Sequence, residues 1–353
     1  MGNNKFNENT RVQVPAALHL CKLGYTYLDN ICAYDTKTNI LIDVFLNAVK
    51  RLNPGLSSSD ASLLYAKIVN IANNDDLGRE FYQLLSANSG TKLIDFENPE
   101  NNDWHVTTEF TCENEDTEDE FRPDITCFVN GLPLAFIEVK KPNNREGILA
   151  ERERINKRMS KSCFRRFFNI TQLMIFSNNQ EYDTDSRVPI QGAFYCCTAK
   201  EKAFFNVFRE EDERYVPDYP YQDITDEMEN KVLKHRNCVV IKNLQEYQTN
   251  KSATTPTNRT ITSMLSKERF LFLLRYGFAY VERKIELADG TQGTQLQKHV
   301  MRYQQLFASY AISNALSQGV KSGIICHKIG RGNTETPFYT VNGLMYNVAT
   351  TCA

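Results

Sequence analysis

The first ninety residues place apolar side chains at the spacing of helices. One apolar face runs through residues 41–52 in the i, i+3, i+4, i+7 pattern and consists of Leu41, Val44, Phe45, Ala48, Val49 and Leu52. Serine and aspartate at residues 58–60 offer an N-terminal cap for a second helix. Residues 78–87 predict a third, shorter helix.

From residue 90 the pattern changes to short apolar runs separated by turn residues, which is typical of strands. Two such runs flank Asn130 and Gly131, the strongest short signal for a β-hairpin. We therefore predict a helix over 147–168, a hairpin over 123–141, and strands over 92–96, 104–111, 171–177 and 191–198. This order of helices, strands, helix and strands predicts an α/β domain.

The last third of the chain is more polar. Residues 209–260 are rich in turn residues and predict a linker or an irregular subdomain. Residues 262–281 predict a helix, and 288–293 a polar loop. A second domain is expected to start near Gln297, and the roughly 55 residues that remain are too few for a complete nucleotide-binding domain.

Composition narrows the class of protein. The chain has 353 residues, of which 41 are basic and 43 acidic, so its net charge of −2 excludes a wholly basic coat protein but not a local basic groove. It has no apolar run of about 18 residues and no apolar N-terminal stretch, so we expect no membrane contact. Its ten cysteines lack metal-ligand spacing and predict reduced thiols in a cytoplasm.

The predicted hairpin carries Asp124 on its first strand and Glu138 and Lys140 on its second. Glu138 and Lys140 share a face because side chains alternate along a strand. A two-residue Asn-Gly turn would point Asp124 to the other face, whereas a three-residue loop over residues 130–132 would pair it with Glu138. We predict the three-residue loop or an equivalent bulge.

Two carboxylates and a lysine on one face suit phosphodiester hydrolysis. Asp124 and Glu138 would bind Mg²⁺ (or Mn²⁺), with the backbone carbonyl of Val139 as a third ligand. Lys140 would orient water or stabilise the transition state as a catalytic residue. The alternative is a surface strand with cross-strand charge pairs. The apolar residues around the charges favour the catalytic interpretation, because charged groups in a central hairpin need a reason.

A basic cluster follows the hairpin on the predicted helix. Such a cluster can neutralise DNA phosphates, although a solvated helix face is the alternative. The candidate DNA-binding residues are Arg152, Arg154, Lys157, Arg158, Lys161, Arg165 and Arg166.

The stretch from residue 122 to 142 carries Arg-Pro-Asp-Ile, Val-Asn-Gly-Leu-Pro-Leu and Ile-Glu-Val-Lys-Lys-Pro. It resembles the N-terminal nuclease domain of type I restriction enzyme R subunits, which belong to the PD-(D/E)xK superfamily. The resemblance implies an α/β fold whose nuclease core is a central mixed sheet flanked by helices, followed by an incomplete RecA-like helicase domain. The implied domains are a nuclease over 1–208, a connecting region over 209–295 and a motor fragment over 296–353.

The same resemblance gives Asp124 and Glu138 as metal ligands and Lys140 as the catalytic lysine. It also implies an accessory acid on the first helix, for which Glu8 is the candidate. Many family members carry a Gln-x-x-x-Tyr pair on the helix after the lysine. Arg154 and Arg158 stand at the matching positions here, and arginine can contact phosphate instead.

The tail resembles the start of the family's motor domain. Residues 302–308, Arg-Tyr-Gln-Gln-Leu-Phe-Ala, are similar to its adenine-reading segment, with Gln305 as the candidate contact. A degenerate Walker A loop follows, although a chance Gly-x-Gly turn is the alternative. Its candidate ATP-binding residues are Gly330, Gly332, Asn333 and Thr334. Asn333 replaces the phosphate-binding lysine, and the chain stops before the remaining motor motifs, so ATP is expected for the family but hydrolysis is not expected here.

The sequence thus predicts the metal-dependent endonuclease domain of a type I site-specific deoxyribonuclease, in a bacterial or archaeal cytoplasm. The resemblance implies double-stranded DNA and the methyltransferase and specificity subunits as partners. Two alternatives stay open: a non-catalytic fragment that binds DNA or the methyltransferase complex, and an inert remnant.

Overall fold

The computed structural model describes residues 7–112, 120–142, 144, 146–182, 190–200, 202–286, 290–320 and 322. Its centre is a seven-stranded sheet whose spatial order equals the chain order. The β1–β2 and β4–β5 pairs are parallel and the other pairs are antiparallel. The strands are β1 (Thr26–Tyr27), β2 (Trp104–Thr108), β3 (Ile125–Val129), β4 (Leu132–Val139), β5 (Leu173–Ser177), β6 (Ala193–Cys196) and β7 (Asn206–Val207). The predicted α/β architecture with a central mixed sheet is confirmed.

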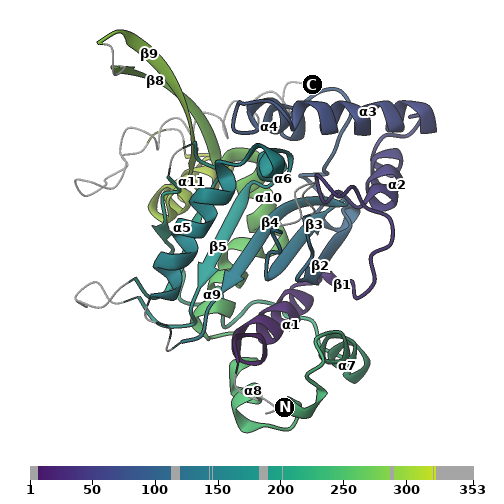
Figure 1. The fold of residues 1–353 in the computed structure, drawn as a ribbon, viewed down its shortest axis with the longest axis vertical. Helices are drawn as coiled ribbons and strands as arrows, with labels where there is room; N and C mark the ends of the chain where they lie inside the picture. Colours follow the sequence, from purple (N-terminus) through teal and green to yellow (C-terminus); the bar gives the residue numbers. More distant parts are fainter. Residues whose placement is uncertain are drawn as a thin grey trace.

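Helices cover both faces of this sheet (Figure 1). One face packs against α5 (Gly147–Met159) and α6 (Arg165–Ile170), and the other against α1 (Val14–Lys22), α9 (Pro256–Leu265) and α10 (Lys267–Tyr276). Along β4, Phe136 belongs to the core under α5 whereas Ile137 belongs to the core under α1. This alternation, which follows from the pleat of a strand, gives the sheet two apolar faces.

Three further helices near the N-terminus confirm the helical periodicity. They are α2 (Ile42–Leu52), α3 (Ser58–Ile71) and α4 (Arg79–Leu85). The cap of α3 is Ser57, whose hydroxyl accepts a hydrogen bond from the Asp60 backbone N–H. A five-residue π-helix, Asn9–Gln13, leads into α1.

Two predicted elements are wrong in detail. Residues 92–96 form no strand, because the Asn53 and Asn102 side chains bond their backbone groups in place of a neighbouring strand. The single helix predicted over 147–168 is broken after α5 by an extended Lys161 and a 3₁₀ turn, Ser162–Phe164. The break turns Phe164, Phe167 and Phe168 toward Phe121 in the core under α5.

Residues 209–260 are more ordered than a linker. They contain α7 (Asp226–His235), a 3₁₀ turn (Val239–Ile241), α8 (Gln245–Asn250) and the first half of α9. Val232, Leu233 and Tyr247 join the core under α1, so this segment packs on the sheet domain. Another 3₁₀ turn, Pro99–Asn101, precedes β2.

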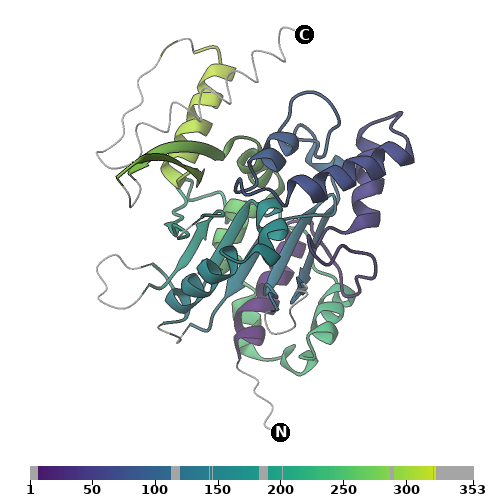
Figure 2. The same ribbon diagram turned by 45° about the horizontal axis from the view of Figure 1, so that its top comes forward.

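The helix predicted over 262–281 is also corrected. It is divided at Ser266 into α9 and α10, and at Phe278 the chain enters a separate hairpin. Its strands, β8 (Phe278–Glu286) and β9 (Gln292–Val300), project from the body (Figures 1 and 2). Helix α11 (Tyr303–Ser317) follows. The RecA-like fragment and the proposed domain limits stay predictions. In the described part of the chain, no helix has the length and apolarity to cross a membrane.

Candidate active site

The β3–β4 hairpin sets the register of the site by a two-residue turn followed by a bulge. Asn130 and Gly131 have φ angles of 51° and 79°, and Val129 pairs directly with Leu132. Of the two predicted forms, the three-residue loop is therefore wrong and the equivalent bulge is confirmed. The register then shifts by one residue, because Phe128 pairs with Pro133 whereas the next pair skips Leu134.

This bulge has the effect expected of the longer loop. Beyond it, Ile125 pairs with Ile137, so the following residue pair brings Asp124 beside Glu138. The Val139 backbone N–H donates a hydrogen bond of 2.8 Å to Asp124 Oδ2. Both carboxylates consequently lie on the α5 side of the sheet.

The turn itself is held tightly against α2. A Cβ added to Gly131 would lie 2.7 Å from the Leu41 carbonyl oxygen and 2.8 Å from the Phe45 backbone nitrogen, so no other residue fits without movement. The buried Asn130 side chain donates to the Leu93 carbonyl and to Asn102 Oδ1. These contacts fix the hairpin end opposite the carboxylates.

Lys140 is the centre of an acidic cluster. Its ammonium nitrogen Nζ lies 3.8 Å from Asp124 Oδ2, 3.8 Å from Glu138 Oε2, 3.6 Å from Glu8 Oε1 and 3.3 Å from Glu151 Oε2. It also donates a 2.7 Å hydrogen bond to the Val139 carbonyl. The structure thus brings together all the predicted catalytic residues and the predicted accessory acid.

Glu8 reaches the cluster from the chain entering α1, on the other face of the sheet. In the same segment, Gln13 Nε2 donates a 2.8 Å hydrogen bond to the Asp124 backbone carbonyl. Arg236, the residue directly after α7, contacts both Gln13 Oε1 and Glu109. This network joins the first helix and α7 to the strand that carries Asp124.

Glu151 is the site residue that sequence reasoning missed. Its side chain is only 1% exposed, on α5, with the Arg154 guanidinium 2.7 Å and the Arg158 guanidinium 3.6 Å from its carboxylate oxygens. The signal was present in the spacing, because Ile148 and Ile155 place Glu151 on the buried face of the helix. A carboxylate on the apolar face of a basic helix therefore indicates a charged partner inside the protein.

Burial and mutual repulsion shape the ionisation of the cluster. Burial, followed by the nearby Asp124 and Glu151 carboxylates, raises the pKa of Glu138 well above its usual value. Burial also raises the pKa of Asp124 and of Glu8, against the opposing effect of Lys140. For Lys140, burial lowers the pKa, but the four surrounding carboxylates more than reverse this and raise it. Lys140 is therefore a cation at neutral pH.

The oxygen atoms fit a hard cation. Glu138 Oε1 is buried and has no hydrogen-bond partner, which is costly unless a cation or water satisfies it. Asp124 and Glu138, with the Val139 carbonyl, form an all-oxygen donor set of the kind that Mg²⁺ accepts while keeping several waters. Within the described ranges, no group of three or more histidine, cysteine, aspartate or glutamate side chains has a metal-binding arrangement. Water and substrate oxygens would have to complete the coordination.

The candidate DNA-binding residues lie along α5, the 3₁₀ turn and α6. Arg154 and Lys157 are exposed, whereas Arg152, Arg158, Lys161, Arg165 and Arg166 are half-buried. Arg158 also stacks its guanidinium 4.5 Å from the centre of the Phe121 ring. Arg154 and Arg158 therefore face the site through Glu151, and their contact with DNA stays a prediction.

Among the candidate ATP-binding residues, Gln305 is buried at the start of α11. Its side-chain oxygen accepts a 2.7 Å hydrogen bond from the Arg302 backbone N–H and so caps the helix. Gly330, Gly332, Asn333 and Thr334 lie outside the described residues. An ATP-binding role stays a prediction for all five.

Comparisons with known proteins place the chain in the class of restriction-enzyme subunits. Residues 5–184, about half of the chain, match the family described as "Type I restriction enzyme R protein N terminus", and the chain belongs to this family. The matched region contains the β3–β4 hairpin and α5, and the predicted resemblance is confirmed.

One curated relative is a protein of Methanocaldococcus jannaschii named "Putative type I restriction enzyme MjaIXP endonuclease subunit". The two sequences are 32% identical over 165 residues, a match that covers 40% of this chain and 16% of the relative. This chain therefore corresponds to a small part of that relative's length.

Proposed function

We propose that this chain carries the metal-dependent DNA endonuclease part of a type I restriction R subunit. The observation that carries the proposal is the meeting of Asp124, Glu138 and Lys140 on one face of a buried hairpin, with Glu138 Oε1 left without a partner. Membership of the R-subunit family and the name of the relative support the same function.

In this proposal Asp124, Glu138 and the Val139 carbonyl hold Mg²⁺ or Mn²⁺. The bound cation would supply charge relief on the scissile phosphate and a water of lowered pKa. The Lys140 ammonium, kept protonated by its carboxylate neighbours, places a positive charge beside the reacting phosphate or its attacking water. Glu8 and Glu151 hold the lysine from two sides, and the apolar core beneath the hairpin keeps the carboxylates fixed.

The proposed substrate is double-stranded DNA, and the proposed partners are the methyltransferase and specificity subunits of a type I complex in the cytoplasm. Sequence recognition would then come from those partners. The expectation that this chain does not hydrolyse ATP rests on Asn333 in place of the Walker A lysine.

The test is nicking of supercoiled plasmid with Mg²⁺ or Mn²⁺, compared with EDTA. Lys140→Ala should lower the rate by about 100-fold or more, the usual cost of removing one electrostatic stabiliser. Lys141→Ala is the matched control, since it removes the neighbouring lysine, which makes no described ion pair. Equal nicking by Lys140→Ala and the parent would refute the assignment.

The same assay separates the two alternatives. A parent chain that binds DNA but does not nick it with either metal would favour the non-catalytic binding fragment. A chain that neither binds nor nicks, and scatters light as aggregates, would favour the inert remnant.

A further inference from the structure

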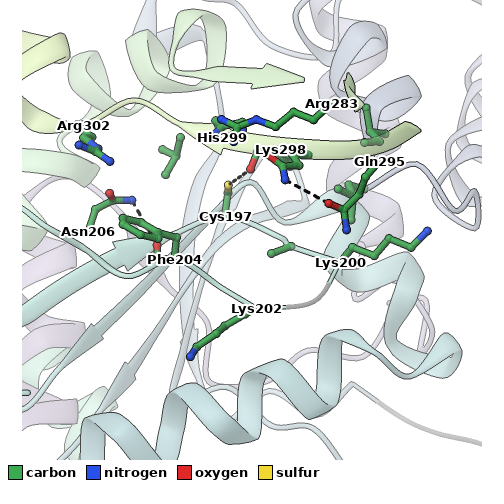
Figure 3. Close-up of a pocket in the computed structure, with 15 residues that line it drawn as sticks. Cys197, Lys200, Lys202, Phe204, Asn206, Arg283, Gln295, Lys298, His299 and Arg302 are labelled. Atoms are coloured by element: carbon green, nitrogen blue, oxygen red, sulfur yellow. Dashed lines mark hydrogen bonds between the residues drawn. The ribbon is translucent and has the colours of Figure 1, made fainter. Parts of the chain in front are cut away.

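A basic cleft, drawn in Figure 3, lies near the start of β5, at the opposite end of this strand from the acidic cluster. Strand β5 connects the two places: Gln172, just before it, bonds Lys298, and Ser177, at its other end, accepts from the Lys140 backbone N–H. The cleft has a volume of about 400 Å³ and lies between the chain leaving β6 and strand β9. We call it the β9 cleft.

The lining of the β9 cleft is cationic. Its basic side chains are Lys200, Lys202, Arg283, Lys298 and Arg302, with His299 beside them, and no aspartate or glutamate is among its described lining residues. Lys202, Arg283 and Arg302 form no ion pair with any carboxylate in the described part of the chain. Lys200 forms an ion pair with Asp75 at 3.6 Å, and both of these side chains are exposed. Lys202, Arg283 and Arg302 are therefore the positive charges of the cleft that no described carboxylate neutralises.

The two walls of the cleft are joined by buried contacts. Lys298 is 6% exposed, and its ammonium donates a 2.8 Å hydrogen bond to Gln172 Oε1. The Cys197 thiol donates to the Lys298 carbonyl at 3.4 Å. The β8–β9 hairpin is therefore fixed to the sheet at its base, while its far end projects from the body (Figures 1 and 2).

An exposed aromatic side chain stands at the rim. Phe204 is 67% exposed, and the Arg302 guanidinium lies 5.7 Å from the centre of its ring. Glu282, an acid on the projecting hairpin, is paired with Arg79 at 2.8 Å and so does not oppose a phosphate.

Basic residues connect this cleft with the acidic cluster. The backbone N–H of Ala203 donates a 2.8 Å hydrogen bond to Asn156 Oδ1, which ties the cleft wall to α5. On α5, Lys157 is exposed beside Asn156, and Arg154 contacts Glu151 in the cluster. A polyanion crossing α5 from the cluster to the cleft would meet the exposed Arg154 and Lys157, with Glu153 as the exposed acid on this part of the helix.

We propose that the β9 cleft binds the backbone phosphates of double-stranded DNA away from the scissile bond, and so holds the duplex across α5. The proposal rests on the proposed endonuclease function, since it supposes that duplex DNA is the substrate. A two-stranded ribbon such as β8–β9 also has the width that a DNA major groove admits. The cleft contacts would be independent of sequence, because phosphates carry no sequence information.

The test is the binding of a fluorescent duplex of about 30 base pairs to the full chain in EDTA, followed by anisotropy over about 50–200 mM salt. Lys202→Ala/Arg302→Ala should lower the slope of log affinity against log salt by about 2, and weaken binding at about 0.1 M salt by one to two orders of magnitude. Lys67→Ala/Lys234→Ala, which removes two exposed lysines from α3 and α7, should bind like the parent. Thermal unfolding checks that each variant is folded.

Several outcomes would refute the proposal that the β9 cleft binds duplex DNA. They are equal losses in the two double variants, parent-like binding by Lys202→Ala/Arg302→Ala, and no duplex binding by the parent at the lowest salt. If Lys202→Ala/Arg302→Ala no longer binds a fluorescent ATP but still binds duplex DNA like the parent, the cleft is a nucleotide pocket instead.

Nicking separates this proposal from the proposed function. If plasmid nicking depends on Lys140 and the cleft variant binds DNA like the parent, the proposed DNA contact of the cleft is refuted and the endonuclease function stands. If the chain binds DNA through the cleft but never nicks plasmid, the endonuclease function is refuted and the DNA contact of the cleft stands.

Discussion

Glu138→Gln tests whether the acidic cluster is under strain without a cation. The change keeps the shape of the side chain and removes its negative charge. Burial, then the carboxylates of Asp124 and Glu151, raise the pKa of Glu138 above its ordinary value of 4.5. An acid with a raised pKa in the folded state contributes stability below its ordinary pKa, and this contribution is lost as the pH rises. We therefore expect the variant to be more stable than the parent in metal-free buffer, by an increment that grows from about pH 5 to about pH 8.

Glutamine keeps a polar atom at the unpartnered Oε1 position, so the increment comes only from the negative charge that the variant removes. A buried polar atom without a partner costs about 1–3 kcal/mol, and more when it is charged, so we take about 1–3 kcal/mol for the charge. An unfolding entropy of about 2.1 cal/mol/K per residue gives about 0.7 kcal/mol/K for 353 residues. The midpoint of thermal unfolding should therefore rise by about 1–4 °C near pH 8.

The assay is thermal unfolding in EDTA and in Mg²⁺, with Glu153→Gln on the exposed face of α5 as the matched control. At ten times its dissociation constant, Mg²⁺ should stabilise the parent by about 1.4 kcal/mol, and the variant by much less. The reasoning is refuted if the variant is less stable than the parent across the whole pH range, or if both gain equally from Mg²⁺.

Three further changes test other parts of the site. Burial lowers the pKa of Lys140, whereas its carboxylate neighbours raise it. Glu151→Gln removes one of these carboxylates and should therefore move the basic limb of the plasmid-nicking pH profile to lower pH. An unmoved limb would mean that Glu151 does not act on the lysine. Gly131→Ala should lower the free energy of unfolding in urea by about 1–3 kcal/mol, because φ is 79° and the new Cβ meets the Leu41 carbonyl; an unchanged midpoint would mean that the turn relaxes freely. Glu8→Gln should reduce nicking by about 10- to 100-fold with little change in thermal stability, and full activity would leave Glu8 without an accessory role.

The hairpin shows what a sequence can and cannot specify about this site. Asn130 and Gly131 identified the turn, because both residues tolerate positive φ. The sequence does not mark Leu134 as the bulged residue, since it is as apolar as its neighbours and equally buried. The prediction of Asp124 beside Glu138 succeeded because a loop residue and a bulge residue change the register by the same amount.

Other differences come from tertiary contacts that no local pattern records. The helix predicted over 262–281 ran past the end of α10 into β8, where nine cross-strand pairs with β9 override the helical pattern. Spacing from Ile148 and Ile155 places Glu151 on the buried face of α5, unlike Glu153, but no local pattern records its contact with Lys140. Glu8 was suggested by the family resemblance rather than by spacing, since it approaches the site from the far side of the sheet.

The two-residue turn at Asn130 also bears on the order in which the chain folds. The contact between the Val139 backbone N–H and Asp124 spans only 15 residues, whereas the contact between Gln13 and the Asp124 carbonyl spans 111. Short loops close with less loss of entropy, so the two carboxylates should be brought together before the N-terminal segment docks. Substitutions in the hairpin should then slow folding, whereas those near Glu8 should mainly speed unfolding, which stopped-flow refolding would distinguish.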